Sequence, residues 1–283
     1  MIKVKKLFPK GSKKAFTLSY DDGIIQDKRL VEIFNRYGLR ATFNLNSGLQ
    51  NEEGSFDLNN LIINRINQEE AVEIYKGHEI AAHGLTHLSL TDIPRELIID
   101  EVIEDRRNLE ELFGYPIRGM AYPNGVYDKK VIDILECIGI EYSRTVNDHF
   151  KFHLPSNPLE WNPTTHHNNA DLMNIAKQFL EKEFKEIGLF YLWGHSYEFD
   201  MDNNWDVIEN FCKYISNKED IWYATNIEII DYLKAFDRLK FTVNLNYVYN
   251  PSAISVWIDV DGSAVEIKGG EIKKIMYNKR SEK

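Results

Sequence analysis

Short apolar runs alternate with longer amphipathic stretches over the first 236 residues of the chain. Residues 14–20 (KAFTLSY) are apolar and rich in strand-forming side chains, and residues 27–37 repeat apolar positions at helical spacing. Residues 41–45 form a second apolar run, so these segments predict a strand–helix–strand unit with parallel strands. The alternation continues through further predicted helices (69–75, 94–112, 129–137, 174–185, 205–217, 227–236) and strands (78–82, 117–122, 140–145, 188–193, 222–225). Six or seven such units favour an α/β barrel or a related doubly wound sheet, with chemistry at the carboxyl ends of the strands.

The pattern changes after Phe236. Strand-like segments then follow one another without a helical period, separated by NPS, DG and GG turn signals (239–249, 254–259, 264–268, 272–277). We therefore predict two domains, a barrel at 1–236 and a small antiparallel β appendage at 237–283 that packs on it.

Composition narrows the class of protein. The chain has 283 residues, with 34 Lys+Arg against 44 Asp+Glu and a net charge of −10, which disfavours nucleic acid as a partner. No apolar run is long enough for a transmembrane helix, and the basic N-terminus lacks the apolar core of a secretory signal. Two cysteines are too few for a disulfide framework. We expect a cytoplasmic protein with no membrane partner.

The pair Asp21–Asp22 directly follows the first predicted strand, in the segment SYDDG. Two adjacent carboxylates are costly unless a positive charge lies beside them, and a divalent metal is a common solution. One carboxylate can then bind the metal while the other transfers protons. Taken alone, the same segment could be a solvated acidic turn.

His83 and His87 lie in the segment HGLTH, after another predicted strand. Two imidazoles four residues apart would share one face of a helical turn, and such pairs suit zinc or a similar ion. One Asp and two His leave an open position for water, as in catalytic zinc sites. Metal-bound water can be a nucleophile near neutral pH.

Two further strand ends carry candidate chemistry. His195, in LWGHS, is a candidate general acid because it follows a late strand. In AYPNG, we expect Tyr122, Pro123 and Asn124 to form a wall of the pocket, with a backbone N–H near Tyr122 available to an oxyanion.

Aromatic and imidazole side chains form a weaker cluster. Trp161 and His166 lie in a loop rich in Asn and Pro and could bind a sugar or only cap the loop. Trp193 and Tyr197 flank His195 and are expected to line the same cleft. Serine-nucleophile, Walker A and Rossmann motifs are absent.

The four motifs TLSYDDG, HGLTH, AYPNG and LWGHS, in this order, resemble those of the polysaccharide deacetylases, carbohydrate esterase family 4. The resemblance covers residues 14–235 and implies a distorted (β/α) barrel of about seven units. It implies a hydrolase that removes an N-acetyl group from an amino sugar or N-acetylated glycan by means of metal-bound water. The implied cofactor is one divalent metal ion, with zinc placed before cobalt or nickel.

The resemblance also implies a role for each motif residue. Asp21 corresponds to the general base, and His195 to the general acid that protonates the leaving amine. Asp22, His83 and His87 correspond to the metal ligands. The proposed substrate-binding positions are Tyr122, Pro123, Asn124, Trp161, His166 and Trp193.

The sequence departs from the family pattern at several places, and two of these departures concern the proposed base and acid. Ala121 stands where the family usually has an arginine that orients the base, and Arg118 and Arg144 are two candidates to replace it. No counterpart of the Asp/Trp pair that tunes the acid is visible.

Two alternative functions stay open. One is an amidase acting on a non-sugar C–N bond, such as a cyclic imide or a formamide. The other is a non-catalytic carbohydrate-binding protein, and the presence of all five motif residues argues against it.

Overall fold

The computed structural model describes residues 4–50, 54–59 and 61–276, and a curled sheet of eight strands forms its centre. The strand order is β8–β7–β6–β3–β2–β10–β9, with β11 paired to β2, and all neighbouring pairs are parallel. The strands are β2 (Lys14–Asp21), β3 (Thr42–Leu45), β6 (Glu79–Ala82), β7 (Gly119–Ala121), β8 (Tyr142–Arg144), β9 (Thr165–His166), β10 (Gly188–Gly194) and β11 (Ile221–Tyr223).

A single segment closes the sheet into a distorted barrel. The Trp161 N–H donates to the Ser143 carbonyl and the Trp161 carbonyl accepts from Thr145, which ties the segment to the β8 side. The Thr164 N–H donates to the Tyr191 carbonyl, and β9 pairs with β10. Residues 161–166 therefore link β8 to β10, and the predicted (β/α) barrel is confirmed.

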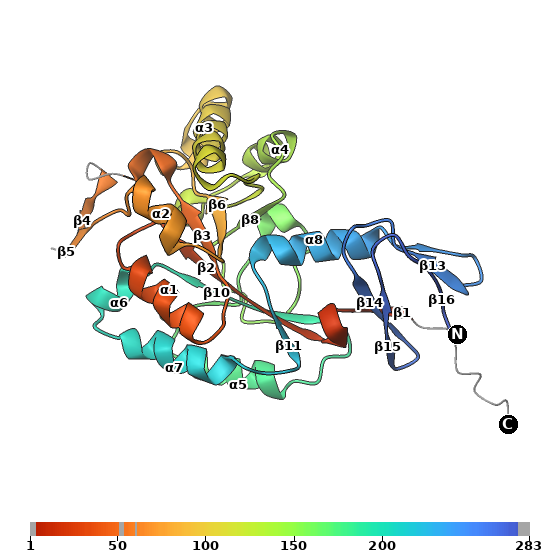
Figure 1. Ribbon diagram of the computed structural model, residues 1–283. Coiled ribbons are helices and arrows are strands. Elements are labelled where there is room, and N and C mark those ends of the chain that lie inside the picture. The colour runs from red at the N-terminus through yellow and green to blue at the C-terminus, as the bar shows by residue number, and fades with distance from the viewer. Residues whose placement is uncertain (1–3, 51–53, 60, 277–283) are drawn as a thin grey trace.

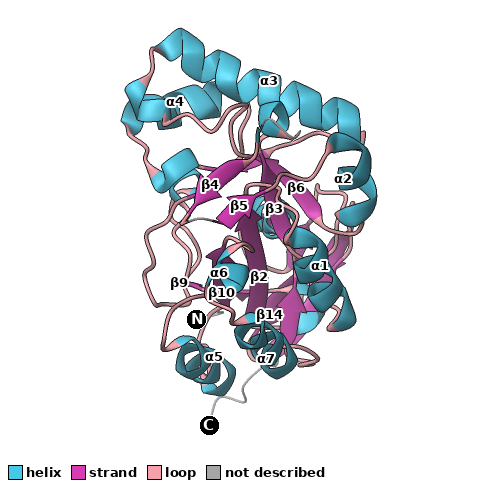
Figure 2. Ribbon diagram, turned by 90° about the vertical axis from the view of Figure 1, so that its left-hand side faces the viewer, coloured by secondary structure: helices cyan, strands magenta, loops and turns pink. Residues whose placement is uncertain are grey.

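Helices cover the outside of this sheet (Figures 1 and 2). Their bounds are α1 (Asp27–Arg36), α2 (Gln68–Ile74), α3 (Arg95–Phe113), α4 (Lys129–Cys137), α5 (Leu172–Glu181), α6 (Glu198–Met201), α7 (Trp205–Ile215) and α8 (Asn226–Asp237). Side-chain caps stabilise the N-termini of two of these helices. Asp128 accepts from the Val131 N–H at α4, and Thr225 and Glu228 form a capping box at α8. None of the described helices has the length and apolar character needed to cross a membrane.

Side chains alternate between the two faces of the central strands. On β2, Phe16 and Leu18 belong to the apolar cluster under the helices, whereas Ala15 belongs to the cluster that fills the barrel. On β10, Phe190 and Leu192 face outward by the same criterion, and Leu189 and Tyr191 face inward. This alternation decides which side chains reach the mouth of the barrel.

Small antiparallel strands lie beyond α8, at the right of Figure 1. They are β12 (Lys240–Phe241), β13 (Tyr247–Tyr249), β14 (Val256–Val260), β15 (Ser263–Ile267) and β16 (Ile272–Lys274). The antiparallel pairing predicted for this region is confirmed. The predicted strand 239–249 is two strands in the structure, and the last predicted position, Tyr277, lies outside the described residues.

Two features were missed by the sequence analysis. β1 (Val4–Leu7) pairs with β14, so a segment near the start of the chain contributes a strand to the sheet of the predicted appendage. The proposed domain boundary at residue 236 therefore does not assign this segment to the sheet in which it lies. A hairpin of β4 (Phe56–Leu58) and β5 (Leu61–Ile63) follows β3. Its strands are too short to give a clear alternation.

Candidate active site

The mouth of the barrel collects the inward-facing residues at the carboxyl ends of the strands. Asp21 continues the inward positions of β2, Asn44 lies at the end of β3, and His83 directly follows β6. Arg144 ends β8, and His195 follows β10. Strand periodicity therefore brings together residues that are far apart in the sequence.

Asp21 is almost completely buried and is held at both carboxylate oxygens. Oδ1 accepts from Asn44 Nδ2 at 2.8 Å, and Oδ2 accepts from the Arg144 guanidinium. Burial alone would raise the pKa of Asp21, but the charges of Arg144, His83 and His195 lower it to about 2. Asp21 is therefore an ionised carboxylate with a fixed orientation.

Arg144, not Arg118, pairs with the predicted base. Ala121 and Arg144 are direct partners in the register of β7 and β8, so the arginine lies one strand away from the usual family position. The small Ala121 side chain leaves room for it. Arg118 instead forms ion pairs with Asp231 and Glu141, at 2.7 and 3.2 Å.

Asp22, His83 and His87 form the candidate metal site. Each offers one ligand atom, and these atoms lie within 4.8 Å of one another. His83 Nδ1 lies 2.9 Å from the Ala121 carbonyl, which can only accept, so Nδ1 carries the ring proton and Nε2 keeps its lone pair. Burial lowers the pKa of His83 to about 4, although the nearby negative charge of Asp21 acts to raise this pKa. The donor set, with two imidazoles and one carboxylate, fits a divalent ion such as zinc.

The two histidines do not share a helical turn, contrary to the prediction. They lie on a loop in which Gly84 and His87 have left-handed backbone angles, with φ of 78° and 61°. The bend nevertheless brings the rings within 4.8 Å, centroid to centroid. The spacing of the two histidines correctly predicted that their imidazoles lie close together. It did not predict the loop conformation that brings them there.

Two acids of α3 hold this loop, and neither was identified from the sequence. Glu101 accepts from the Thr86 N–H at 2.6 Å, and Asp105 accepts from the His83 N–H at 3.0 Å. Both are buried, and burial raises the pKa of Asp105 to about 7. A signal was present, because the two acids lie four residues apart on the apolar stripe of the predicted helix.

Asp22 turns toward the same mouth because its backbone is left-handed, with φ of 83°. Its carbonyl accepts from Arg65, and its Oδ1 lies 3.3 Å from Arg65 Nη1 and 3.8 Å from His87 Nε2. Burial would raise the pKa of Asp22, but His195, His83 and Arg65 lower it. Arg65 is thus a positioning residue that no motif indicated.

His195 lies opposite Asp21, with 3.8 Å between Nε2 and Oδ2. Its Nδ1 lies 3.6 Å from Glu198 Oε1, and its backbone N–H donates to Glu198 Oε2 at 3.2 Å. Burial lowers the pKa of His195, but the carboxylates of Glu198, Asp22 and Asp21 raise it to about 9. Glu198 on α6 is therefore a carboxylate beside the candidate acid that the sequence analysis did not find.

Glu198 is also bound by two other imidazoles. His166 Nε2 and His167 Nε2 lie 3.2 and 3.1 Å from Oε2. Burial alone would raise the pKa of Glu198, but the nearby imidazoles of His166, His167 and His195 lower it strongly. His166 Nδ1 accepts from the Asn168 N–H, so Nε2 must carry the ring proton and donate to Glu198. This second group of His and carboxylate side chains therefore has the protonation of a hydrogen-bond network, not of a metal site.

Trp193 packs against Arg144, the partner of Asp21. Its ring lies under the Arg144 guanidinium at 4.4 Å, and its Nε1 donates to Asp148 at 2.7 Å. Asp148 also accepts from the His166 N–H. Trp193 is only 7% exposed, so it fixes Arg144 and offers little surface to a substrate.

Two predicted substrate contacts are wrong. Trp161 is 1% exposed and packs against Tyr142 and Tyr191 inside the barrel, because its segment closes the sheet. Tyr122 is equally buried, and its N–H donates to the Arg144 carbonyl at 3.1 Å, so this N–H is not free for an oxyanion.

The turn after Tyr122 lies beside the loop that carries His83 and His87, as its proposed role as a pocket wall requires. Pro123 lies next to Gly84, close enough that a side chain at Gly84 would contact its ring. Asn124 is exposed and donates to Ser89 at 2.9 Å. These two residues remain candidates for the wall of the pocket.

A protein-family model matches part of the chain. The polysaccharide deacetylase family model matches residues 9–143. No curated protein matches the chain in sequence.

Several solved structures share the fold. A candidate polysaccharide deacetylase from Mycobacterium smegmatis is 16% identical, with a TM-score of 0.59, over 82% of this chain and 94% of that one. The allantoinase Puue is 13% identical, with a TM-score of 0.57, over 79% and 91%. A family 4 carbohydrate esterase from Streptomyces lividans, solved with acetate, is 14% identical, with a TM-score of 0.50, over 75% and 93%. At these identities the likeness concerns the fold, while the family model concerns the sequence itself. Residues 9–143 therefore match the polysaccharide deacetylase family, which confirms the resemblance that the sequence motifs indicate.

Proposed function

We propose that the protein is a metal-dependent hydrolase that removes an N-acetyl group from an amino sugar or an N-acetylated glycan. The family match supports deacetylase activity, that is, hydrolysis of a C–N bond. The proposal of a metal-dependent reaction on an N-acetyl group rests on one observation. Asp21 contacts both Arg144 and His195, and this group lies beside the candidate metal ligands Asp22, His83 and His87.

The roles of the chain's own residues follow from their contacts. Asp21, kept ionised by Arg144, accepts a proton from the attacking water as its oxygen bonds to the acetyl carbon. His195, kept protonated by Glu198, donates a proton to the nitrogen as the C–N bond breaks, which releases acetate and a free amine. A divalent cation held by Asp22, His83 and His87 would polarise the carbonyl and lower the pKa of the water.

Acetate release from N-acetylglucosamine oligomers tests this proposal, with protein loaded with zinc, cobalt or nickel. We expect Asp21→Asn to keep one metal per chain and to lose about 10²–10⁴-fold in turnover, the range expected for a general base. Asp133→Asn, on the exposed face of α4, is the matched control and should retain full activity.

Wild-type activity in Asp21→Asn would remove Asp21 as the base. Release of ammonia or formate from simple amides, with no acetate from any sugar, would favour the non-sugar amidase. Glycan binding with no hydrolysis of either substrate class would favour a binding protein.

A further inference from the structure

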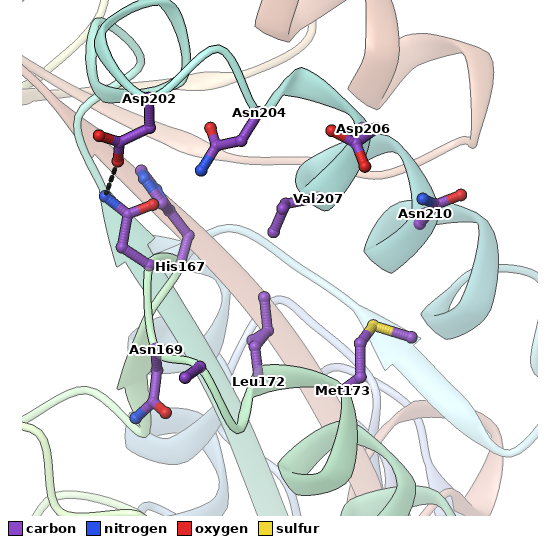
Figure 3. A pocket seen from close by; sticks show the side chains of 11 residues that line it. His167, Asn169, Leu172, Met173, Asp202, Asn204, Asp206, Val207 and Asn210 are labelled. Atoms are coloured by element: carbon purple, nitrogen blue, oxygen red, sulfur yellow. Dashed lines mark hydrogen bonds between the residues drawn. The ribbon is translucent and has the colours of Figure 1, made fainter.

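Packed rings close one side of the proposed acid. His167 contacts Glu198 on the side away from His195 and stacks on Phe199, with 4.1 Å between ring centroids. It also packs so tightly on Gly194 that a side chain at that position would collide with it. A cavity of about 360 Å³ between α5 and α7 lies beyond the buried His167 ring (Figure 3). A substrate therefore reaches His195 from the mouth of the barrel and not through this cavity.

A row of stacked side chains lines the mouth beside His195. The Tyr197 ring stacks on the His195 imidazole, with 5.2 Å between centroids and 29° between planes. Phe56, from the β4–β5 hairpin, meets the Tyr197 ring edge-on at 6.1 Å, and the Arg65 guanidinium lies 5.2 Å from the Phe56 ring. Arg65 in turn contacts Asp22. The row thus leads from the candidate acid to a candidate metal ligand.

The hydroxyl of Tyr197 is a hydrogen-bond donor that is free to act on a bound molecule. In the part of the chain that the structure describes, no group accepts a hydrogen bond from it, and the side chain is only half-buried. Burial raises the pKa of Tyr197 well above its usual range, and the negative charges of Asp22, Glu198 and Asp21 raise it further. Tyr197 is therefore a neutral phenol whose hydroxyl lies near the carboxylates of the proposed site.

The proposed reaction needs a donor of this kind. Negative charge develops on the acyl oxygen as water adds to the acetyl carbon, and a fixed hydrogen-bond donor at that oxygen stabilises the transition state. The backbone N–H of Tyr122, expected to serve an oxyanion, donates to the Arg144 carbonyl instead. Tyr197 is connected to Asp22 through the row of side chains, so it lies toward the candidate metal ligands, where the carbonyl would be polarised.

We propose that the Tyr197 hydroxyl donates a hydrogen bond to the acyl oxygen of the bound substrate and so stabilises the charge that develops there. The phenol keeps its proton throughout, and the protons of the reaction still pass through Asp21 and His195. This inference rests on the proposed function and deepens it, because it adds a catalytic residue from outside the four sequence motifs. The role does not depend on what is attached to the nitrogen, so it serves sugar and non-sugar amides alike.

Two variants separate the hydroxyl from the ring. Tyr197→Phe removes only the hydroxyl, whereas Tyr197→Leu also removes the ring that stacks on His195. Tyr214→Phe is the matched control, because Tyr214 is half-buried on α7 and packs against the apolar cluster under the helices. The measurements are steady-state acetate release from N-acetylglucosamine oligomers, zinc content, and calorimetric binding of acetate, whose oxygens can accept the same hydrogen bond. Thermal unfolding verifies that each variant folds.

We expect kcat to fall about 10²-fold in Tyr197→Phe, the size of effect known for one oxyanion donor, with little change in KM or in zinc content. Acetate should bind about tenfold more weakly to Tyr197→Phe than to wild-type protein. Tyr214→Phe should change none of these quantities.

Full turnover in a folded Tyr197→Phe protein would overturn the inference and leave the proposed function in place. Loss of turnover in Tyr197→Leu alone would also overturn it, since the ring would then only position His195. A higher KM at unchanged kcat would place the hydroxyl on another part of the substrate, which again contradicts the inference. If wild-type protein releases no acetate from any sugar, the proposed function is wrong, and acetate binding decides the inference: weaker binding in Tyr197→Phe supports the donor, and equal binding excludes it.

Discussion

Two clusters of histidine and carboxylate side chains share one mouth of the barrel, yet they differ in chemistry. In the first, Asp22, His83 and His87 lie together; in the second, His166 and His167 surround Glu198. The residue types are nearly the same. The difference lies in what faces the other nitrogen of the ring.

A backbone carbonyl faces Nδ1 of His83, whereas a backbone N–H faces Nδ1 of His166. The carbonyl places the proton on Nδ1 and leaves Nε2 free to bind a metal. The N–H places the proton on Nε2, which then donates to a carboxylate. The backbone around each ring, not the choice of residue, distinguishes the candidate metal ligand His83 from the hydrogen-bond donor His166.

The number of metal ions bound per chain tests this comparison most directly. Among the variants considered, His83→Ala should have the largest effect on metal binding and on turnover. We expect one equivalent of zinc in wild-type protein, none in His83→Ala and one in His166→Ala, measured by elemental analysis after dialysis. Turnover should fall at least ~10³-fold in His83→Ala, since the charge that stabilises the reacting carbonyl is lost. Two equivalents in wild-type protein, with one lost in His166→Ala, would show that the second cluster binds metal too.

The second cluster should act through the acid, so Glu198→Gln should lower turnover without removing the metal. The neutral amide no longer favours protonated His195, and we expect a fall of ~10²-fold in kcat with little change in KM. The measurement is steady-state acetate release combined with metal analysis. Glu209→Gln, on the exposed face of α7 where Glu209 pairs with Arg36, should change neither quantity. Loss of metal from Glu198→Gln would contradict the separation of the two clusters.

The order of strands and helices was predictable because both periods are strong in this sequence. β2 and β10 are buried on both faces and appear as apolar runs, and most helices carry a distinct apolar stripe. β1 was not predictable, because its partner β14 lies about 250 residues away and its own sequence, VKKL, has a weak pattern. Pairing over such a distance leaves no local signal.

The motif residues of the site were predictable, but their supporting residues were only partly so. Arg144 could be named as a candidate but not chosen over Arg118, since the choice depends on the register of β7 against β8. Glu198 lies three residues after His195, and nothing in the segment HSYE shows that α6 returns the carboxylate to the imidazole. Trp161 was misassigned because an aromatic residue in a polar loop can equally close a barrel.

Buried acids also hold the backbone near the proposed catalytic residues, and beside His83 this acid is Asp105. Its two oxygens accept from the backbone N–H groups of Ser47 and His83, at 2.8 and 3.0 Å. In Asp105→Asn one of these N–H groups would face an NH₂ group, at a cost of about 1–3 kcal/mol in the free energy of unfolding. We expect zinc affinity to fall by about 10–100-fold, measured by competition with a chelator. Asp100→Asn, exposed on the same helix, should leave zinc affinity unchanged; an equal loss there would show that the effect is not due to the loop contact.

Under the turn that follows His195, Asp27 accepts from Ser196 Oγ at 2.5 Å and from Tyr75 at 2.7 Å. Burial raises the pKa of Asp27 to about 7, against the effect of these hydrogen bonds. Between the unfolded pKa near 4 and this value, the folded protein binds more protons than the unfolded chain, so stability falls as pH rises. The stabilisation from protonated Asp27 is complete below pH ~4 and is lost as pH rises through 7, a change of up to about 4 kcal/mol. Asp27→Asn does not titrate, so its free energy of unfolding in urea, measured from pH 4 to 8, should fall less steeply than that of wild-type protein. Parallel pH profiles for the two proteins would mean that Asp27 is already ionised in the folded state, and that Ser196 is anchored by a charged group and not by a neutral one.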